Sequence, residues 1–213
     1  RFADGRAYVA FDAHRSDDDN PYLFVTDDFG ETWKPLHGSL PRGSTRCLRE
    51  DVVNENLLFV GTEFAAWASI DRGQSWNKLN TNLPTVAIHE IAVHPTEGEI
   101  VAATHGRSLW VLDIMSLRQL TTEVVKADAH LYKPADAMRW RSEPRKGSIY
   151  GSGMRLFVGD NPPRGAQIYY SLAKKATSLN LKIVDATGAT IRQLRGRSEP
   201  GLHRVSWDLS QVI

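Results

Sequence analysis

An eight-residue phrase occurs twice in this sequence and limits the possible folds more than any other feature. The copies, residues 26–33 and 69–76, both follow the pattern Ser/Thr-x-Asp-x-Gly-x-Ser/Thr-Trp. The tryptophans that end them, Trp33 and Trp76, are 43 residues apart. A repeat of about 40–50 residues with four short strands is typical of a β-propeller blade. The spacing therefore predicts an all-β chain that contains part of a propeller.

Each residue type in the phrase suits a tight turn between two strands. The aspartate carboxylate can accept hydrogen bonds from backbone N–H groups of its own turn. The glycine adopts the positive φ that other residues resist, and the tryptophan can bury a large apolar surface between neighbouring sheets. We therefore expect a structural role for six residues, Asp28, Gly30, Trp33, Asp71, Gly73 and Trp76.

The phrase resembles the Asp-box, also called the BNR repeat, of sialidases, sortilin-type receptors and related secreted propellers. In that family the box is a structural turn at the periphery of a blade, remote from any active centre. The resemblance thus implies that Asp28 and Asp71 are not catalytic.

Strand-like runs separated by turns continue to about residue 120 and form three units. The expected strands cover residues 6–13, 22–26 and 32–36, then 45–50, 57–62, 66–70 and 75–79, then 88–93, 100–104 and 109–112. Closed propellers have about four to eight blades. Residues 1–120 are therefore interpreted as the last two to three blades, with the remaining blades in an upstream part of the same precursor.

The sequence changes in character after residue 120. Residues 121–153 are rich in proline and glycine toward their end and are expected to be a connector. Further strands are expected over residues 154–158, 166–172, 179–184, 191–194 and 203–208. Residues 165–172, 181–188 and 201–209 resemble the FlgD-type Ig-like modules of secreted bacterial proteins. Because such a sandwich needs about seven strands, residues 154–213 are expected to form an incomplete one.

A second resemblance concerns four phrases in the first 120 residues. Residues 11–15, 60–64, 82–86 and 104–113 together resemble the end of the propeller in bacterial sortilin/VPS10-like Asp-box proteins, often labelled glycosyl-hydrolase-like. Residues 65–68 depart from that pattern. The resemblance implies a secreted, periplasmic or cell-surface location in a bacterium, and either ligand binding across the propeller or glycan hydrolysis.

Turns between second and third strands should share the edge opposite the boxes. That edge would collect residues 12–20, 63–64 and 105–107, with His14, Glu63, His105 and Arg107 as the candidate binding residues. One interpretation is a polar binding rim, because propeller ligands commonly bind at a loop-lined mouth. The other is a set of ordinary solvated loops, in which Arg107 pairs with a carboxylate and locks adjacent blades.

Residues that could bind a metal or catalyse hydrolysis give weaker signals. Asp17, Asp18 and Asp19 could together hold Ca²⁺, but they lack the alternating oxygen spacing and glycine of a calcium loop, so a solvated acidic turn is the alternative. His89 and His94 lie on opposite faces of a strand and do not form a simple metal pair. A glycosidase needs two placed carboxylates or a tyrosine nucleophile with its acid partner. No catalytic residue, metal site or cofactor is assigned.

Composition narrows the classes of partner. The net charge is +1, with 26 basic and 25 acidic residues and no basic stripe, which disfavours nucleic acid. No apolar run approaches the length that crosses a bilayer. The only cysteine, Cys47, excludes an internal disulfide and is expected to be a buried structural thiol.

Three functions stay open at this point. The leading hypothesis is non-enzymatic binding of a protein, peptide or envelope component, with the sandwich as a spacer, anchor or assembly module. The second is a glycoside hydrolase, sialidase-like or otherwise glycan-active, whose catalytic residues lie in the upstream blades. The third is a structural subunit of a larger complex.

Overall fold

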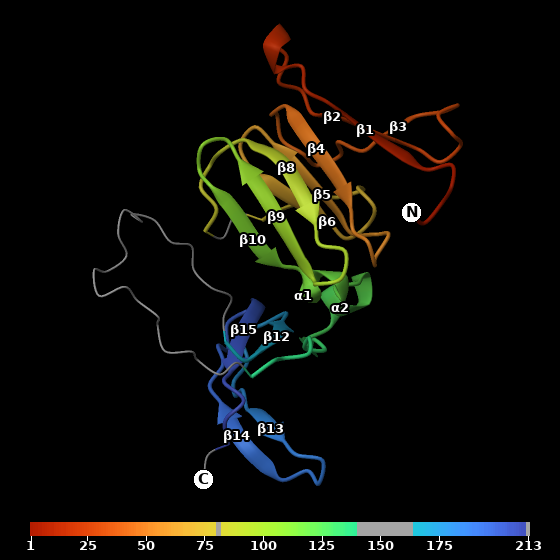
Figure 1. Cartoon of the computed structure of the whole chain (residues 1–213). Helices are drawn as coiled ribbons and strands as arrows, with labels where there is room; N and C mark the ends of the chain where they lie inside the picture. Colours follow the sequence, from red (N-terminus) through yellow and green to blue (C-terminus); the bar gives the residue numbers. More distant parts are fainter. Residues whose placement is uncertain (80–81, 140–163, 212–213) are drawn as a thin grey trace, which may run out of the picture. The chain divides into compact units, whose positions relative to one another are not determined.

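Antiparallel β-sheets make up almost all of the regular structure (Figure 1). The computed structural model describes residues 1–79, 82–139 and 164–211, and the chain divides into two compact units, Arg1–Thr121 and Thr122–Ile213. The all-β prediction is therefore confirmed. Within the described residues, no helix is long and apolar enough to span a membrane.

The first unit contains three antiparallel meanders in chain order. The first sheet has β1 (Ala7–Phe11), β2 (Tyr22–Thr26) and β3 (Lys34–Pro35). The second sheet has β4 (Thr45–Glu50), β5 (Leu58–Thr62), β6 (Ala66–Ser69) and β7 (Asn77–Lys78). The third sheet has β8 (Ile88–Val93), β9 (Glu99–Thr104) and β10 (Leu109–Asp113). All ten strands lie within or beside the ranges that the sequence predicts.

The second and third sheets repeat one strand register. Each has an irregularity at the start of its first strand, between Thr45 and Cys47 in β4 and between Ile88 and Glu90 in β8. A bulge bends a strand and redirects the side chain of the extra residue. The repeat therefore extends from the sequence phrase to a detail of backbone pairing.

The three strands of the first sheet correspond to the second, third and fourth strands of the second sheet. Thr26 and Ser69 begin the two boxes, and they pair with Ala7 and Leu58. Strand β1 therefore corresponds to β5, and β2 corresponds to β6. Strand β4 has no counterpart in the first sheet among the described residues.

Two hydrophobic clusters hold the three sheets together. In β2, Leu23 and Val25 are buried on one face while Phe24 lies on the other, as strand alternation requires. The cluster joining the first and second sheets consists of Leu23, Val25, Leu36, Leu40, Leu48, Leu58, Val60 and Trp76. The cluster joining the second and third sheets consists of Cys47, Leu57, Phe59, Ala66, Ala68, Ile88, Ile91, Ile100, Ala102 and Ile114. Cys47 is buried as expected, and burial raises the pKa of its thiol to about 11.

Short helices interrupt the strand pattern at two places in the first unit. The 3₁₀ turn η1 (His14–Ser16) lies between β1 and β2, and α1 (Met115–Arg118) follows β10. The Arg118 guanidinium binds the fully buried Asp51 carboxylate, with Nη2–Oδ1 at 2.8 Å, and so ties α1 to the second sheet. No helical periodicity is visible in the sequence here because each helix has only about one turn.

Over its described residues, the second unit contains one helix and two small sheets. The expected strand over residues 154–158 lies outside the described residues. The turn after residue 184 is a hairpin, in which the Asp185 carboxylate accepts bonds from the N–H groups of Thr187 and Ala189. The elements are α2 (Thr122–Lys126), the sheet β11 (Ala129–Leu131), β12 (Ala166–Leu172) and β15 (Gly201–Trp207), and the sheet β13 (Leu181–Val184) and β14 (Thr190–Leu194). Helix α2 and strand β11 lie within the range expected to be a connector, and β11 pairs with β12.

Candidate functional site

The first box is a closed turn whose polar groups satisfy one another. Thr26 Oγ1 donates to Asp28 Oδ1 at 2.6 Å and accepts the Gly30 N–H at 2.9 Å. The Thr32 N–H donates to the same carboxylate oxygen at 2.9 Å. Hydrogen bonds from Thr26 and Thr32 lower the pKa of Asp28 to about 2. The carboxylate is therefore used inside its own turn.

The second box contains the same hydrogen bonds. Ser69 Oγ donates to Asp71 Oδ1 at 2.7 Å and accepts the Gly73 N–H at 2.7 Å, and the Ser75 N–H donates to Asp71 Oδ1 at 2.9 Å. Burial acts to raise the pKa of Asp71, but the hydrogen bonds from Ser75 and Ser69 outweigh it and the pKa is lowered. Both aspartates lie in the positions expected for structural turn residues.

The two box tryptophans differ in their surroundings. Trp76 is 5% exposed, and its Nε1 donates to the Leu36 carbonyl in the preceding repeat at 2.8 Å. Trp33 is 43% exposed, and its Nε1 donates to Gly30 O in its own turn at 3.1 Å. Only the second tryptophan therefore joins neighbouring repeats.

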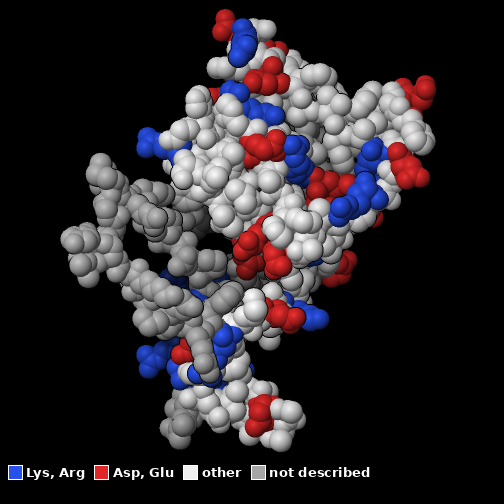
Figure 2. Space-filling model, in the orientation of Figure 1, with Lys and Arg blue, Asp and Glu red and all other residues white. Residues whose placement is uncertain are grey.

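A charge network joins the first and second sheets near the boxes. Arg6 Nε lies 2.7 Å from Asp27 Oδ1, and Arg6 Nη1 lies 3.1 Å from Glu55 Oε2. Arg72 Nη2 lies 2.5 Å from the same Glu55 oxygen. The hydrogen bond to Asp27 raises the pKa of Arg6, so its charge is fixed. On the face that Figure 2 shows, acidic and basic side chains of the first unit are intermixed, without a large field of one sign.

At the edge opposite the boxes, Asp12, Glu63 and His105 occupy equivalent positions. Each directly follows the strand of its repeat that ends there: β1, β5 or β9. Arg46, the extra residue of the β4 bulge, forks between the first two of these side chains. Its Nη1 lies 2.8 Å from Asp12 Oδ2, and its Nη2 and Nε bind Glu63. Arg46 thus ties the first and second repeats together.

The corresponding place in the third repeat has different chemistry. His89 is the extra residue of the β8 bulge, equivalent to Arg46, and its ring meets the His105 ring edge to face. The ring centroids are 5.0 Å apart. The sequence pattern assigned Asp12, Glu63 and His105 to this edge but did not identify Arg46 or His89. Arg46 and His89 both lie near the start of the first strand of their sheet. That position predicts a side chain at this edge only when the bulge is known.

The other two expected rim residues lie on exposed loops. His14 Nδ1 lies 3.3 Å from Asp19 Oδ1. The backbone of Arg107 closes a turn, since its N–H donates to Thr104 Oγ1 and its carbonyl accepts from Trp110 Nε1. Among the described residues no salt bridge involves Arg107, and no hydrogen bond or ring contact joins any two of His14, Glu63, His105 and Arg107.

In the acidic run of the β1–β2 loop, Asp18 forms hydrogen bonds with neighbouring residues of the same loop and strand. Asp18 accepts the Tyr22 hydroxyl at 2.6 Å and the Asn20 N–H at 3.0 Å, and these bonds lower its pKa. Asp17 has φ of 55° and follows η1. Within the part of the chain that the structure describes, no group of three or more His, Cys, Asp or Glu side chains could hold a metal ion.

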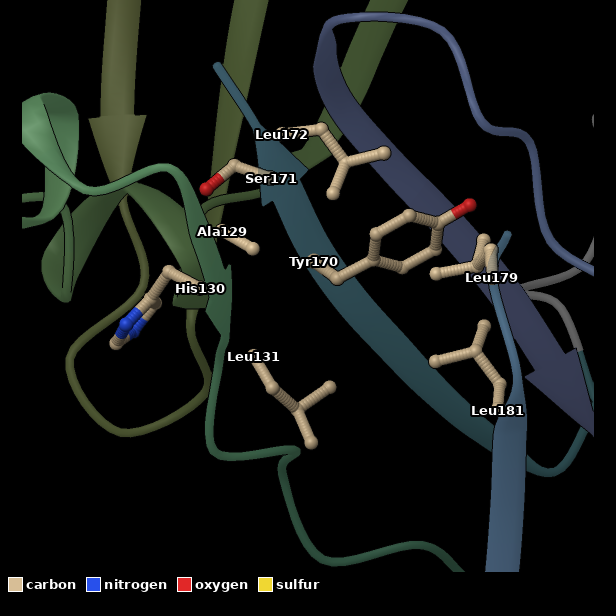
Figure 3. Close-up of a pocket in the computed structure, with 8 residues that line it drawn as sticks. All are labelled: Ala129, His130, Leu131, Tyr170, Ser171, Leu172, Leu179 and Leu181. Carbon is tan, nitrogen blue, oxygen red and sulfur yellow. The ribbon is translucent and has the colours of Figure 1, made fainter. Parts of the chain in front are cut away.

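Two apolar hollows lie away from the rim. In the first sheet Val9, Phe11, Phe24 and Trp33 line a cavity of about 390 Å³. In the second unit a cavity of about 190 Å³ is lined by residues of β11 and β12 and by Leu179 and Leu181, before and in β13 (Figure 3). There Tyr170, Leu179 and Leu181 point toward one another while His130 points away. The Tyr170 hydroxyl is engaged by the backbone of Arg197, so this hollow is part of an apolar core.

Comparisons with known proteins add little to this geometry. No family model matches the sequence, and no curated protein matches it. A solved structure described as "YCF48 bound to D1 peptide" aligns at 14% identity with a TM-score of 0.28, over 81% of this chain and 46% of that chain. This chain therefore spans less than half the length of that structure, and a likeness at this level carries no argument about function.

Proposed function

We propose that this chain is a non-enzymatic binding or scaffold component of sortilin-like propeller type. In this proposal residues 1–120 are the last blades of an Asp-box propeller, an Ig-like sandwich follows, and upstream blades of the same precursor complete the ring. The protein acts in a secreted, periplasmic or cell-surface setting and engages a protein, peptide or envelope component. The repeated register of the sheets and the two matching box turns support the propeller part.

One observation supports a binding function. The residues and hydrogen bonds at the box edge are the same in the two boxes, whereas those at the opposite edge differ from repeat to repeat. At the box edge, Asp28 and Asp71 make the same hydrogen bonds. At the loop edge, the equivalent positions hold Asp12, Glu63 and His105 and make different contacts. Loops on a rigid scaffold are where binding residues concentrate. The variable edge is therefore the better candidate for recognition.

The third repeat offers the most accessible chemistry on that edge. Its turn after β9 exposes His105 and Arg107, whereas Arg46 already binds two carboxylates. A guanidinium and an imidazole together favour a ligand with a carboxylate or several carbonyl acceptors. An acidic or extended peptide is the ligand class that fits.

The test is an array of peptides and glycans probed with the 213-residue chain and two double variants. We expect acidic peptides to bind, and His105→Ala with Arg107→Ala to weaken binding by about tenfold or more. The matched control, Glu31→Ala with Gln74→Ala, alters exposed residues of the two boxes and should leave binding unchanged. Equal losses in both variants, or binding to glycans alone, would overturn the proposal. Glycan turnover by the full precursor that requires an upstream carboxylate would favour the glycosidase instead.

A further inference from the structure

The turn that precedes β1 is the same turn that joins β4 to β5. In the first sheet the Arg6 N–H donates to the Ala3 carbonyl at 3.2 Å. In the second sheet the Leu57 N–H donates to the Asn54 carbonyl at 3.0 Å. Both bonds span three residues and end just before the equivalent strands β1 and β5. The backbone before β1 therefore has the shape of a hairpin turn.

A second pair of bonds confirms this equivalence. Each turn is held to the box of its own repeat by one backbone bond, from Phe29 N to Gly5 O at 3.0 Å and from Arg72 N to Asn56 O at 2.9 Å. Residues 1–6 thus match residues 52–57 in position and in contacts. In the second sheet this turn has a strand on both sides.

Strand β1 is paired on one edge only. Strand β5 lies between β4 and β6, whereas β1 is the end strand of its sheet and pairs with β2. An open strand edge is a template for pairing with another strand. The first sheet therefore presents, within the described residues, the edge that β4 covers in the second sheet.

The apolar face beside this edge is also open. By strand register, Phe24 corresponds to Trp67 and Val9 to Val60, and by the box phrase Trp33 corresponds to Trp76. Val60 is fully buried and Trp76 is 5% exposed, while Trp33 is 43% exposed. In the second sheet, Leu48 of β4 lies opposite Val60 and belongs to the same core cluster. The cavity of about 390 Å³ is lined by Val9, the equivalent of Val60, and by Phe24 and Trp33 on the same face.

We propose that β1 and this cavity bind an extended polypeptide segment as one more antiparallel strand, in the register that β4 adopts along β5. The inference rests on the proposed function, because the upstream blades of the propeller supply the segment. Its occupant is a strand with a basic residue followed two positions later by an aliphatic residue.

The pattern comes from the two first strands that the chain already contains. Arg46 precedes Leu48 by two positions in β4, and His89 precedes Ile91 by two positions in β8. The aliphatic residue enters the core between sheets in both cases. The basic residue lies at the bulge, and beside β1 it would meet Asp12, the equivalent of Glu63. The incoming strand is thereby specified by shape and by charge.

The chain supplies its own probe. A copy of residues 44–51, with alanine in place of the cysteine, is fused directly before Arg1. The direct fusion reproduces the connection between β4 and β5, because Arg1 is equivalent to residue 52. We expect the extended protein to unfold several degrees higher and to show slower amide exchange over Ala7–Phe11 by about tenfold.

The matched control carries the same extension with aspartate in place of the copied leucine. We expect it to behave like the 213-residue chain, as should the original extension in a Phe24→Asp background. Equal unfolding midpoints and equal exchange in the extended and control proteins would overturn the proposal. So would a stable dimer of the 213-residue chain that Phe24→Asp dissociates, because the occupant would then be a second copy. Unfolding and exchange are measured without a ligand. A negative result in the peptide-binding test of His105 and Arg107 therefore leaves this proposal untouched.

Discussion

The first and second sheets contain the same box turn but place its tryptophan in different environments. Asp28 and Asp71 accept equivalent bonds, and the turn backbone follows the same path. Trp76 is nevertheless buried against Leu36 of the preceding repeat, while Trp33 is 43% exposed. The turn is thus determined by local hydrogen bonds, whereas burial of the tryptophan depends on a neighbouring sheet. A sequence phrase can repeat while its contribution to stability does not.

Replacing each tryptophan by alanine should give the largest contrast between the sheets. Trp76→Ala removes a buried ring from the cluster between the first and second sheets, and we expect it to cost about 3–5 kcal/mol of unfolding free energy. Trp33→Ala removes an exposed ring and should cost under about 1 kcal/mol. Urea unfolding followed by circular dichroism measures both values. Similar losses would show that Trp33 is buried in solution, as in a molecule with an additional neighbouring sheet.

Replacing the box glycines, Gly30 and Gly73, by alanine should give a smaller difference in unfolding free energy between the two sheets. Gly73 has φ of 86°, and a Cβ there would lie 3.0 Å from the Leu36 side chain. Gly30 has φ of 94°, and a Cβ there would meet only the Trp33 ring, at 3.8 Å. Both alanine variants force a left-handed backbone, at a cost of about 1–2 kcal/mol. Gly73→Ala should lose about 1 kcal/mol more, because crowding against Leu36 adds to the strain.

The same unfolding experiment checks this ranking. Ser75→Ala and Thr32→Ala serve as a matched control pair, since each removes a hydroxyl from its box without changing the backbone. Their losses should be closer to each other than the losses of the two glycine variants. If Gly30→Ala lost more unfolding free energy than Gly73→Ala, crowding against Leu36 would not be the source of the additional cost at Gly73.

The sequence predicted the features that depend on local chemistry. The phrase located both turns, and strand β2 was predicted with its observed bounds, since apolar residues and turn residues mark its limits. The bulge residues Arg46 and His89 were missed because no residue type identifies a bulge. Strand β11 was missed because three residues carry too little pattern, and its pairing with β12 is a long-range contact.

The candidate site was predicted in part for the same reason. Topology alone placed Glu63 and His105 at one edge, because turns between the same strands of a meander share an edge. The partner of each depended on the register of the first strand, which brings Arg46 to Glu63 and His89 to His105. Side chains that meet across strands can be assigned only after that register is known.

Replacing Asp28 by asparagine should have the smallest effect and should depend on pH. The hydrogen bonds from Thr26 and Thr32 lower the pKa of this carboxyl from its ordinary value of 3.8 to about 2. A lowered pKa in the folded state stabilises the fold above the ordinary value, and this stabilisation is lost as the pH falls through the folded value. The difference in unfolding midpoint between the parent protein and Asp28→Asn should therefore be constant above about pH 5 and shrink toward about pH 2.

Asp71→Asn provides the comparison within the second sheet. Its pKa is also lowered, because the bonds from Ser75 and Ser69 outweigh the opposing effect of burial. We expect the same direction of pH dependence, measured by thermal unfolding between about pH 2 and pH 6. If the tryptophan contrast reflects only the neighbouring sheet, the two aspartate variants should have similar pH profiles while the two tryptophan variants differ. A different result would be an effect of Asp71→Asn that depends on pH and an effect of Asp28→Asn that does not. It would mean that the hydrogen bonds to Asp28 do not form in the first box turn, which has no sheet on its outer side among the described residues.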